Sequence, residues 1–325
     1  MTHLAKTTAR AAIALLLVAL STAIAAQPAY PSRPVRIVVP FAAGGSTGAL
    51  AQLLAARLAK AWDQQVLVDP RGGGNTVIGT DLVAKAAPDG YTLLLTSNSH
   101  LVIPQLIMTT FDPLKDFTPI ATVSRTELIL VVNPALSSST LQEFIALAKL
   151  RPGEINYASA GTSSATHLAG ELLASMTGLK IQHVPYKGSG PAMTDLLGGQ
   201  VQASFQTPIV AIPFVRSGKL RALAVSGETR LSALPQTPTF AESGLPGFNA
   251  TTWFGVIAPA GTPKPVTDKV AQEIEKVLTM PDFRDRLNEL GMEPLVSTPT
   301  QFGELMKTTR AEAARLIKAA NIKLE

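Results

Sequence analysis

The chain has no cysteine among its 325 residues. Disulfide bonds are therefore excluded, and so is attachment to a membrane through a lipid-modified cysteine. A chain of this length corresponds to about two domains by the usual size of a domain. It can bury enough apolar surface to be stable through its own core.

Aromatic residues and clustered positive charges are also scarce. The sequence has two Trp and four Tyr, and its 28 Lys and Arg exceed its 23 Asp and Glu by five without forming a basic run. We expect no nucleic-acid partner, because such proteins concentrate basic residues on one surface and stack bases on aromatic rings. Hydrophobic residues make up 46% of the chain, which excludes a disordered protein.

Apolar runs of membrane-spanning length are missing, and the longest run lies near the N-terminus. There, Lys6 and Arg10 precede an apolar stretch, 11–20, that leads into small residues. A positive start, a short apolar core and a small-residue end are typical of a secretory signal peptide. The stretch is too short to span a bilayer with these flanks, and an uncleaved anchor is the alternative interpretation. We expect residues 1–25 to be a signal peptide and the mature protein to be periplasmic.

The motifs that hold nucleotides are missing as well. The chain has neither the G-x-x-x-x-G-K-S/T phosphate loop nor the G-x-G-x-x-G fingerprint. The run Gly72-Gly73-Gly74 lacks their spacing, which favours a flexible turn. His167 and Glu171 are four residues apart and could share a metal on a helix, but no second His-rich cluster completes a ligand set. We therefore expect no cofactor and no metal.

Short apolar runs alternate with amphipathic segments along the rest of the chain. Val35–Val39 is β-branched and is followed by Pro40, which predicts a buried strand. Apolar residues at helical spacing then continue to Trp62. The pattern further predicts strands at 66–68 and 91–96 with a helix at 76–86 between them. This βαβαβ alternation predicts parallel strands with helices on the sheet faces.

The alternation starts again after Phe111-Asp112-Pro113. From Pro263 the chain is mainly helical, and apolar residues mark one face of a final helix. The two βα series indicate two similar lobes. The second series predicts strands at 128–132, 155–158, 181–184, 201–205, 221–225 and 253–258, and helices at 141–150, 166–177 and 192–197.

Three loops rich in Gly, Ser and Thr join predicted strand ends to predicted helix starts, at 40–47, 159–164 and 185–190. The first backbone N–H groups of a helix lack partners and, with the helix dipole, attract an anion. Glycine lets a ligand approach the backbone, and hydroxyl groups add donors. Ser and Thr also cap helices without binding anything, which is the alternative for any single loop. Lys187 in the third loop is either a partner for a carboxylate or a solvated loop residue.

Several segments of the mature chain carry a family resemblance. They are YPSRPVRIVVPFAAGGST (30–47), AKAAPDGYTLL (84–94), NYAS (156–159), HLAGEL (167–172), VPYKGS (184–189), DLLGGQV (195–201), GKLRALAV (218–225) and WFG (253–255). In this order they resemble the Bug-type receptors, the periplasmic solute-binding proteins of tripartite tricarboxylate transporters. The resemblance covers essentially the whole mature chain. Two departures are Gly48, where the family often has Asp, and the glycine-rich loop 70–75, and both bear on the identity of the ligand.

The resemblance implies an α/β, two-lobed, periplasmic-binding-protein-like fold of type II. Each lobe would be a mixed, mostly parallel sheet flanked by helices. Residues 27–126 and 255–325 would form one lobe, residues 127–254 would form the other, and two strands would cross between them. The lobes would close on a small organic carboxylate, bound through backbone and hydroxyl donors and delivered to a membrane transporter or a sensor. We expect a monomer with no catalytic residues.

The family's ligand loops fall on 41–47, 97–99, 159–164, 186–189 and Gln206 of this chain. Within them the candidate ligand-binding residues are Phe41, Ala43, Gly44, Gly45, Ser46, Thr47, Ser97, Asn98, Ser159, Ala160, Gly161, Thr162, Ser163, Ser164, Tyr186, Lys187 and Gln206.

Two other functions stay open at this point. The segment 161–165 half resembles the nucleophile elbow of a hydrolase, so an exported serine hydrolase using Ser163 and His167 is the main alternative. The second alternative is a structural or interaction protein without a small ligand.

Overall fold

The computed structural model describes residues 30–319 and 322. The chain groups into two units, Met1–Ser32 and Arg33–Glu325, and the second contains the helices and strands described below. The expected signal peptide, residues 1–25, lies outside the described residues. None of the helices within the described part of the chain is both long enough and apolar enough to cross a membrane.

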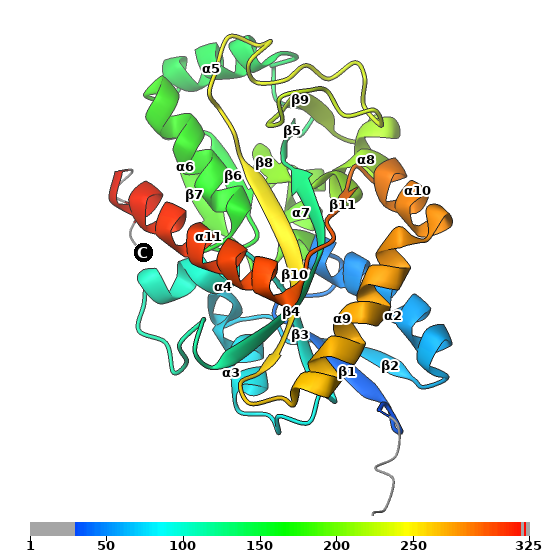
Figure 1. The fold of residues 1–325 in the computed structure, drawn as a ribbon. Coiled ribbons are helices and arrows are strands. Elements are labelled where there is room, and N and C mark those ends of the chain that lie inside the picture. The colour runs from blue at the N-terminus through cyan, green and yellow to red at the C-terminus, as the bar shows by residue number, and fades with distance from the viewer. Residues whose placement is uncertain (1–29, 320–321, 323–325) are drawn as a thin grey trace, which may run out of the picture. The chain divides into compact units, whose positions relative to one another are not determined.

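The first of two sheets has six strands in the order β11-β4-β10-β3-β1-β2 (Figure 1). β1 runs parallel to β2 and β3, whereas β10 runs antiparallel to β3 and β4 and β11 runs antiparallel to β4. It follows that β1, β2, β3 and β4 point the same way. The strands are β1 (Val35–Val39), β2 (Val66–Pro70), β3 (Thr92–Ser97), β4 (Phe117–Glu127), β10 (Thr251–Pro259) and β11 (Glu293–Pro294).

The second sheet has five strands in the order β7-β6-β8-β5-β9. β6 is parallel to β7 and β8, and β5 is antiparallel to β8 and β9, so β5 alone of these strands runs the other way. The strands are β5 (Ile129–Val132), β6 (Asn156–Ser159), β7 (Gln182–Pro185), β8 (Ala203–Gln206) and β9 (Arg221–Val225). The prediction of mixed sheets in which most strands share one direction is confirmed.

Helices follow most strands and flank both sheets (Figure 1). They are α2 (Ser46–Trp62), α3 (Val77–Ala84), α4 (Ser99–Val102), α5 (Leu141–Leu150), α6 (Ala165–Thr177), α7 (Ser189–Leu197), α8 (Pro208–Arg216), α9 (Lys264–Thr279), α10 (Pro281–Glu289) and α11 (Pro299–Ala319), with single 3-10 turns at Gly74–Thr76 and Ile103–Gln105.

Each sheet has its own apolar core. One core centres on Phe144, Phe205 and Phe240, which pack on the second sheet. The other includes Trp253 and Phe302, and the final helix α11 thereby packs on the first sheet as its apolar face predicts. Gly255 in β10 makes this packing possible, because a Cβ atom there would lie 2.3 Å from the Phe302 ring. A smaller buried cluster, which includes Leu168 of α6 and Ala313 of α11, connects the two parts.

Two connections join the sheets. Leu128 alone separates β4 of the first sheet from β5 of the second, and the segment 226–250 returns the chain from β9 to β10. Figure 1 shows β4 and the yellow β10 side by side where the chain passes between the sheets. Thr126 of β4 pairs with Thr252 of β10 at this point.

The sequence did not predict β4, because polar residues alternate along it. Thr122, Ser124 and Thr126 are nevertheless buried. Their hydroxyl groups donate to successive carbonyls of the segment around β11, namely Leu295 (2.5 Å), Glu293 (2.9 Å) and Gly291 (2.7 Å). A strand of this kind is stabilised by hydrogen-bonded hydroxyls on one face, which a search for apolar periodicity does not detect.

Candidate ligand-binding site

Four helices begin around one small cavity. α2, α6, α7 and α8 directly follow β1, β6, β7 and β8, at the carboxyl ends of these strands, where ligands of α/β sheets bind. The cavity has a volume of about 30 Å³, which is room for about two water-sized groups. Its lining comes from both sheets: Phe41, Gly45, Ser46, Thr47, Ser97, Ser99, Leu128, Ala160, Ser164, Ala165, Thr166, Ser189, Thr207, Thr252 and Phe254.

Three of these helices have no side-chain cap at the cavity. The N-cap residues Gly45 of α2, Gly188 of α7 and Thr207 of α8 accept no hydrogen bond through a side chain, whereas Ser164 of α6 accepts one from the backbone N–H of His167. None of the four helices has an acidic residue in its first turn. Unpaired N–H groups at the starts of α2 and α7, together with the dipoles of all four helices, therefore make the cavity attractive to an anion; α8 begins with Pro208, which has no N–H to donate.

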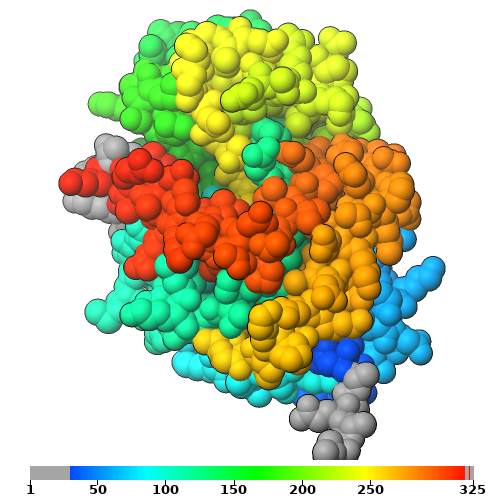
Figure 2. Space-filling model, in the orientation of Figure 1, coloured from blue at the N-terminus to red at the C-terminus, as the bar shows by residue number. Residues whose placement is uncertain are grey.

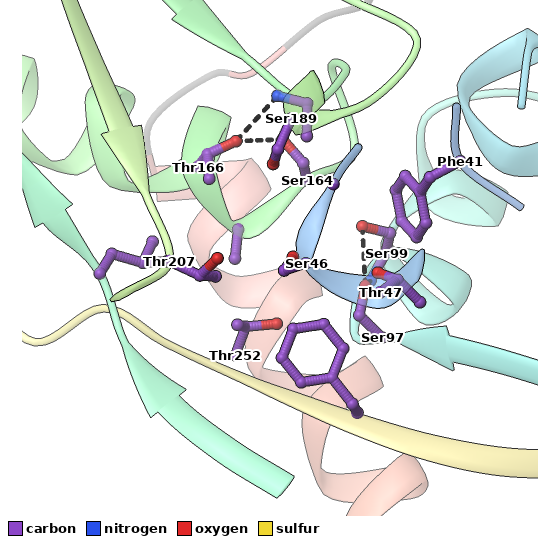
Figure 3. Close-up of a pocket in the computed structure, with 15 residues that line it drawn as sticks. Phe41, Ser46, Thr47, Ser97, Ser99, Ser164, Thr166, Ser189, Thr207 and Thr252 are labelled. Atoms are coloured by element: carbon purple, nitrogen blue, oxygen red, sulfur yellow. Dashed lines mark hydrogen bonds between the residues drawn. The ribbon is translucent and has the colours of Figure 1, made fainter. Parts of the chain in front are cut away.

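The cavity supplies hydroxyl groups and no side-chain charge. None of the described residues that line it is ionisable. Figure 3 shows the hydroxyls of Ser46, Thr207 and Thr252 directed into the same space. Thr207 is buried, and its Oγ1 atom has no hydrogen-bond partner among the described residues. A buried hydroxyl without a partner is costly, so a ligand that accepts its proton would be favoured.

Seven of the candidate residues line this cavity: Phe41, Gly45, Ser46, Thr47, Ser97, Ala160 and Ser164. Ser99 and Ser189, which belong to the predicted loops, line it too. The other candidates lie outside the lining: Ala43, Gly44, Asn98, Ser159, Gly161, Thr162, Ser163, Tyr186, Lys187 and Gln206.

Lys187 and Tyr186 have other roles in this structure. The Lys187 side chain is exposed, and its backbone carbonyl accepts a 2.8 Å hydrogen bond from the N–H of Ala42. The Tyr186 hydroxyl donates to Asp195 at 2.6 Å. Burial, followed by that hydrogen bond, raises the pKa of Tyr186 to about 12. The Tyr186 hydroxyl therefore stays protonated and donates to Asp195.

The loops of the two sheets touch each other directly. Besides the contact from Ala42 to Lys187, Oδ1 of Asn75 accepts a 3.1 Å hydrogen bond from the N–H of Thr162. Gly190 has no room for a side chain here, because a Cβ atom would lie 2.2 Å from the carbonyl oxygen of Ala43. The glycine residues of these loops thus serve the approach of backbone to backbone.

The loop that contains Asn75 has a strained backbone. Asn75 has φ +51° and Thr76 has φ +81°, and the left-handed region is unfavourable for a β-branched residue such as Thr. The Thr76 side chain is buried, and its Oγ1 atom has no hydrogen-bond partner among the described residues. Strain of this kind persists where the surroundings hold a loop in place for function.

The second sheet carries a histidine cluster beneath the loop 159–164. His167 and His183 stack with ring centroids 4.0 Å apart, and Nε2 of His183 lies 2.6 Å from Oγ of the fully buried Ser159. Nδ1 of His167 lies 2.5 Å from the carbonyl oxygen of Thr162. Burial, followed by the neighbouring His167, lowers the pKa of His183 to about 3, so this ring is neutral at physiological pH.

Ser163 and His167, the predicted nucleophile pair of a hydrolase, have other partners. The Ser163 hydroxyl lies 3.5 Å from the carbonyl oxygen of Asn75, and the His167 ring contacts Thr162 and Glu171. Ser159, the serine that does contact a histidine ring of the cluster, is fully buried. Nε2 of His167 is 3.6 Å from Oε1 of Glu171. No group of three potential metal ligands occurs among the described residues. The contacts of the histidine cluster instead connect the loop 159–164 to β7 and α6.

Six lining residues were not anticipated from the sequence: Leu128, Ala165, Thr166, Thr207, Thr252 and Phe254. Thr207 precedes Pro208 at the start of α8, and a Thr-Pro pair after a predicted strand is a recognisable helix start. Leu128, Thr252 and Phe254 lie in or beside the strands that connect the sheets. Only the pairing of β4 with β10 brings them to the loops.

Comparison with known proteins places the chain in a known family. The family model of the "Tripartite tricarboxylate transporter family receptor" matches residues 50–322. The protein BugT of Bordetella pertussis is 41% identical over 275 residues, which is 84% of each chain.

Two solved structures share the fold over nearly the whole chain. The periplasmic binding protein BugD superposes with a TM-score of 0.88 at 36% identity, covering 91% of this chain and 100% of its own. The R. palustris protein Rpa4515, solved with adipate, has a TM-score of 0.88 at 34% identity and covers 90% of this chain and 99% of its own.

Proposed function

The chain belongs to the tripartite tricarboxylate transporter family of receptors, and on this premise we propose that it captures a small organic carboxylate in the cavity between its two sheets. The proteins of this family and the solved relatives are binding receptors, so this chain is a receptor and not an enzyme. The ligand would pass to a membrane transporter, or to a sensor, without being changed.

One observation carries the proposal: four helix N-termini meet at a cavity lined by hydroxyl groups and by no ionisable residue among those described. A carboxylate accepts hydrogen bonds and carries the charge that these helix ends attract. A cation would meet the positive ends of four helices. A neutral ligand would leave the unpaired donors of α2 and α7 without a charged acceptor. Rpa4515, with adipate, is a relative whose ligand has this chemistry.

The proposed contacts are mainly backbone ones. The N–H groups at the start of α2, around Ser46 and Thr47, would bind one carboxylate oxygen. Thr207 would donate its unpartnered hydroxyl proton to the other oxygen. The candidates outside the lining, such as Gly161 and Thr162, would act by fixing the loop rather than by touching the ligand.

The two sheets are the proposed lobes, with boundaries at 27–126 plus 255–325 and at 127–254. The lobes would close on the ligand about the paired residues Thr126 and Thr252, which lie where both strands leave the first sheet. The contacts of Ala42 with Lys187 and of Asn75 with Thr162 would form on closure. A ligand favours closure only if it binds the closed form more tightly.

Export and assembly complete the proposal. The chain belongs to an extracytoplasmic receptor family, one relative being described as a periplasmic binding protein. Residues 1–25 would direct export and be removed, and the mature receptor would act as a monomer. Intact-mass analysis of periplasmic protein tests removal of the signal, because retention of Met1 would contradict it.

A thermal-shift screen tests the function. A carboxylate at about 100 times its Kd should stabilise the protein by about 2.7 kcal/mol and raise its Tm. Each acid should be paired with its primary amide, which has nearly the same shape and no charge. Native mass spectrometry of gently purified protein would show a ligand retained from the cell. A screen in which amides stabilise the protein as well as the acids do, or in which no acid stabilises it, would contradict the proposal.

A further inference from the structure

A second cavity lies between α6 and α11. Its volume is about 390 Å³, which is within the range of small-molecule sites. Leu168 and Leu172 of α6 form one wall, and Ala313 and Leu316 of α11 form the facing wall, with Val102 of α4 nearby. These residues recur at helical spacing, so each helix presents one apolar face to the cavity. Figure 2 shows the red residues of α11 next to the green region that contains α6.

This apolar cavity adjoins the polar one. Ala165 lines both. Asn98 lines the apolar cavity and stands between Ser97 and Ser99, which line the polar one. The hydroxyl of Thr252 in the polar cavity donates a 2.8 Å hydrogen bond to Oδ1 of Asn98 in the apolar cavity. The two spaces are therefore neighbours, separated at this point by the bond between two side chains.

In this structure the polar cavity has room for little more than one carboxylate group. Its volume of about 30 Å³ suits the two oxygen atoms of a carboxylate, so a longer ligand would extend into an adjoining space. The apolar cavity is an adjoining space of suitable size. A ligand whose carboxylate is held at the helix starts would reach it past Asn98 and Thr252.

The walls of the apolar cavity favour an apolar group as the ligand body, by which we mean the part of the ligand beyond its carboxylate. Alkyl or aryl groups gain from burial against the leucine residues. Of the described residues that line this cavity, Glu312 alone is ionisable, and its negative charge disfavours a second carboxylate. Polar lining groups such as Asn249 and Thr309 are neutral. We propose that the ligand is a monocarboxylate with an apolar alkyl or aryl body, rather than a dicarboxylate or a tricarboxylate. The inference rests on the proposed carboxylate-receptor function.

Calorimetry on the mature protein tests this choice with matched pairs of acids. Hexanoate should bind more tightly than adipate, which has the same chain length and a second carboxylate. From butanoate to hexanoate, each added methylene should lower Kd about fourfold, the factor that corresponds to burial of one methylene group. A parent protein that binds adipate or citrate more tightly than hexanoate would overturn the inference and leave the receptor function intact. If no carboxylate of either kind binds, the receptor function fails and the inference fails with it.

Two variants locate the ligand body. Leu172→Gln should reduce the gain in affinity that each added methylene gives. The Kd for acetate should stay unchanged, because acetate does not extend into the apolar cavity. The exposed Leu150, on another helix, gives the matched control Leu150→Gln, which should leave the whole series unchanged. A gain per methylene that Leu172→Gln leaves intact would place the body elsewhere and overturn the inference.

A charge reversal provides the second test, independent of packing. Glu312→Lys should improve binding of adipate relative to hexanoate by about fivefold, as an exposed ion pair can contribute. Glu304→Lys makes the same change of charge on α11 without lining this cavity, and it should leave the ratio unchanged. Equal effects of the two substitutions on this ratio would show that the charge of α11 acts from a distance. That result would contradict a ligand body beside Glu312.

Discussion

The backbone N–H of Thr162 donates a 3.1 Å hydrogen bond to Oδ1 of Asn75, and this bond joins a loop of the second sheet to a strained loop of the first. The Ser163 hydroxyl lies 3.5 Å from the carbonyl oxygen of the same Asn75, and the N–H of Ala42 donates to the carbonyl oxygen of Lys187. These bonds would break when the lobes separate. Asn75 would therefore contribute to the lifetime of the closed, ligand-bound state.

Substitution of Asn75 tests this role. Asn75→Gly tolerates the observed φ of +51° and removes the acceptor. We expect the ligand to dissociate about 2- to 13-fold faster, since one neutral hydrogen bond contributes about 0.5–1.5 kcal/mol. Asn75→Asp is the control, because Asp keeps an acceptor and also adopts the left-handed region. Stopped-flow dissociation rates that are equal for the parent and Asn75→Gly would contradict the role.

Closure of the two lobes on the ligand should make the molecule more compact. The account predicts that the radius of gyration falls when a verified ligand saturates the protein, because the lobes rotate about the strands at Thr126 and Thr252. Small-angle scattering measures this change. A radius of gyration that is the same with and without ligand would contradict closure.

Thr207→Val separates binding from folding. The Thr207 side chain caps no helix N–H, and its buried hydroxyl has no partner among the described residues. Valine of the same shape should therefore leave the unliganded protein as stable as before, or more stable by up to about 1 kcal/mol. Ligand affinity should fall about tenfold, which corresponds to about 1.4 kcal/mol. Unchanged affinity, measured by calorimetry beside urea unfolding, would remove Thr207 from the site.

Lys187→Met distinguishes a backbone site from a lysine–carboxylate pair. The Lys187 side chain is exposed, and only its backbone carbonyl contacts the opposite loop. We expect the Kd to change less than twofold, because an exposed ion pair contributes about 1 kcal/mol at most and this one does not face the cavity. Ser46→Ala, which removes a lining hydroxyl, should by comparison weaken binding about tenfold. Loss of binding in Lys187→Met alone would contradict the backbone mechanism.

Stability and ligand affinity should depend on pH in different ways. His183, with a pKa of about 3 in the folded protein and an ordinary value of 6.5, binds a proton more readily in the unfolded chain. Its contribution to stability is therefore complete above about pH 6.5 and is lost as the pH falls towards 3. The buried His100, with a pKa lowered by burial to about 4, acts in the same direction.

Urea unfolding between pH 7 and pH 5 should show this loss, and each histidine contributes at most about 1.4 kcal/mol per pH unit. His183→Asn should reduce the slope. Ligand affinity should stay constant from pH 6 to pH 8, because no described residue that lines the polar cavity titrates. Affinity that falls steeply across this range would indicate a titrating side chain in the site.

Much of the fold followed from periodicity. The helix Leu141–Leu150 and the strand Arg221–Val225 have the bounds that the sequence predicts. The β4 strand was missed because buried hydroxyl groups, which a distant segment satisfies, interrupt its apolar residues. Helix α8 was missed as well, and it contains Pro213 within its length. Local patterns report apolar faces, and they do not report polar groups that find partners far along the chain.

The site was predictable only in part. Residues at helix starts, such as Ser46 and Ser164, could be recognised because unpaired N–H groups follow from any strand–loop–helix sequence. Thr252 and Leu128 could not be, because the pairing of strands between the sheets brings them to the cavity. The sequence left open whether Lys187 pairs with a carboxylate or is a solvated loop residue. The structure places its side chain on the surface.

The most direct test of the central claim is calorimetry of the mature parent protein with two acids, hexanoate and adipate, each beside its own amide, hexanamide and adipamide. We expect that at least one acid binds and that its amide binds about 100-fold more weakly or not at all, because the positive ends of four helices favour an anion and hydrogen bonds to a charged acceptor are stronger. An amide that binds as tightly as its acid, or four titrations without measurable heat in a protein shown to be folded, would contradict it.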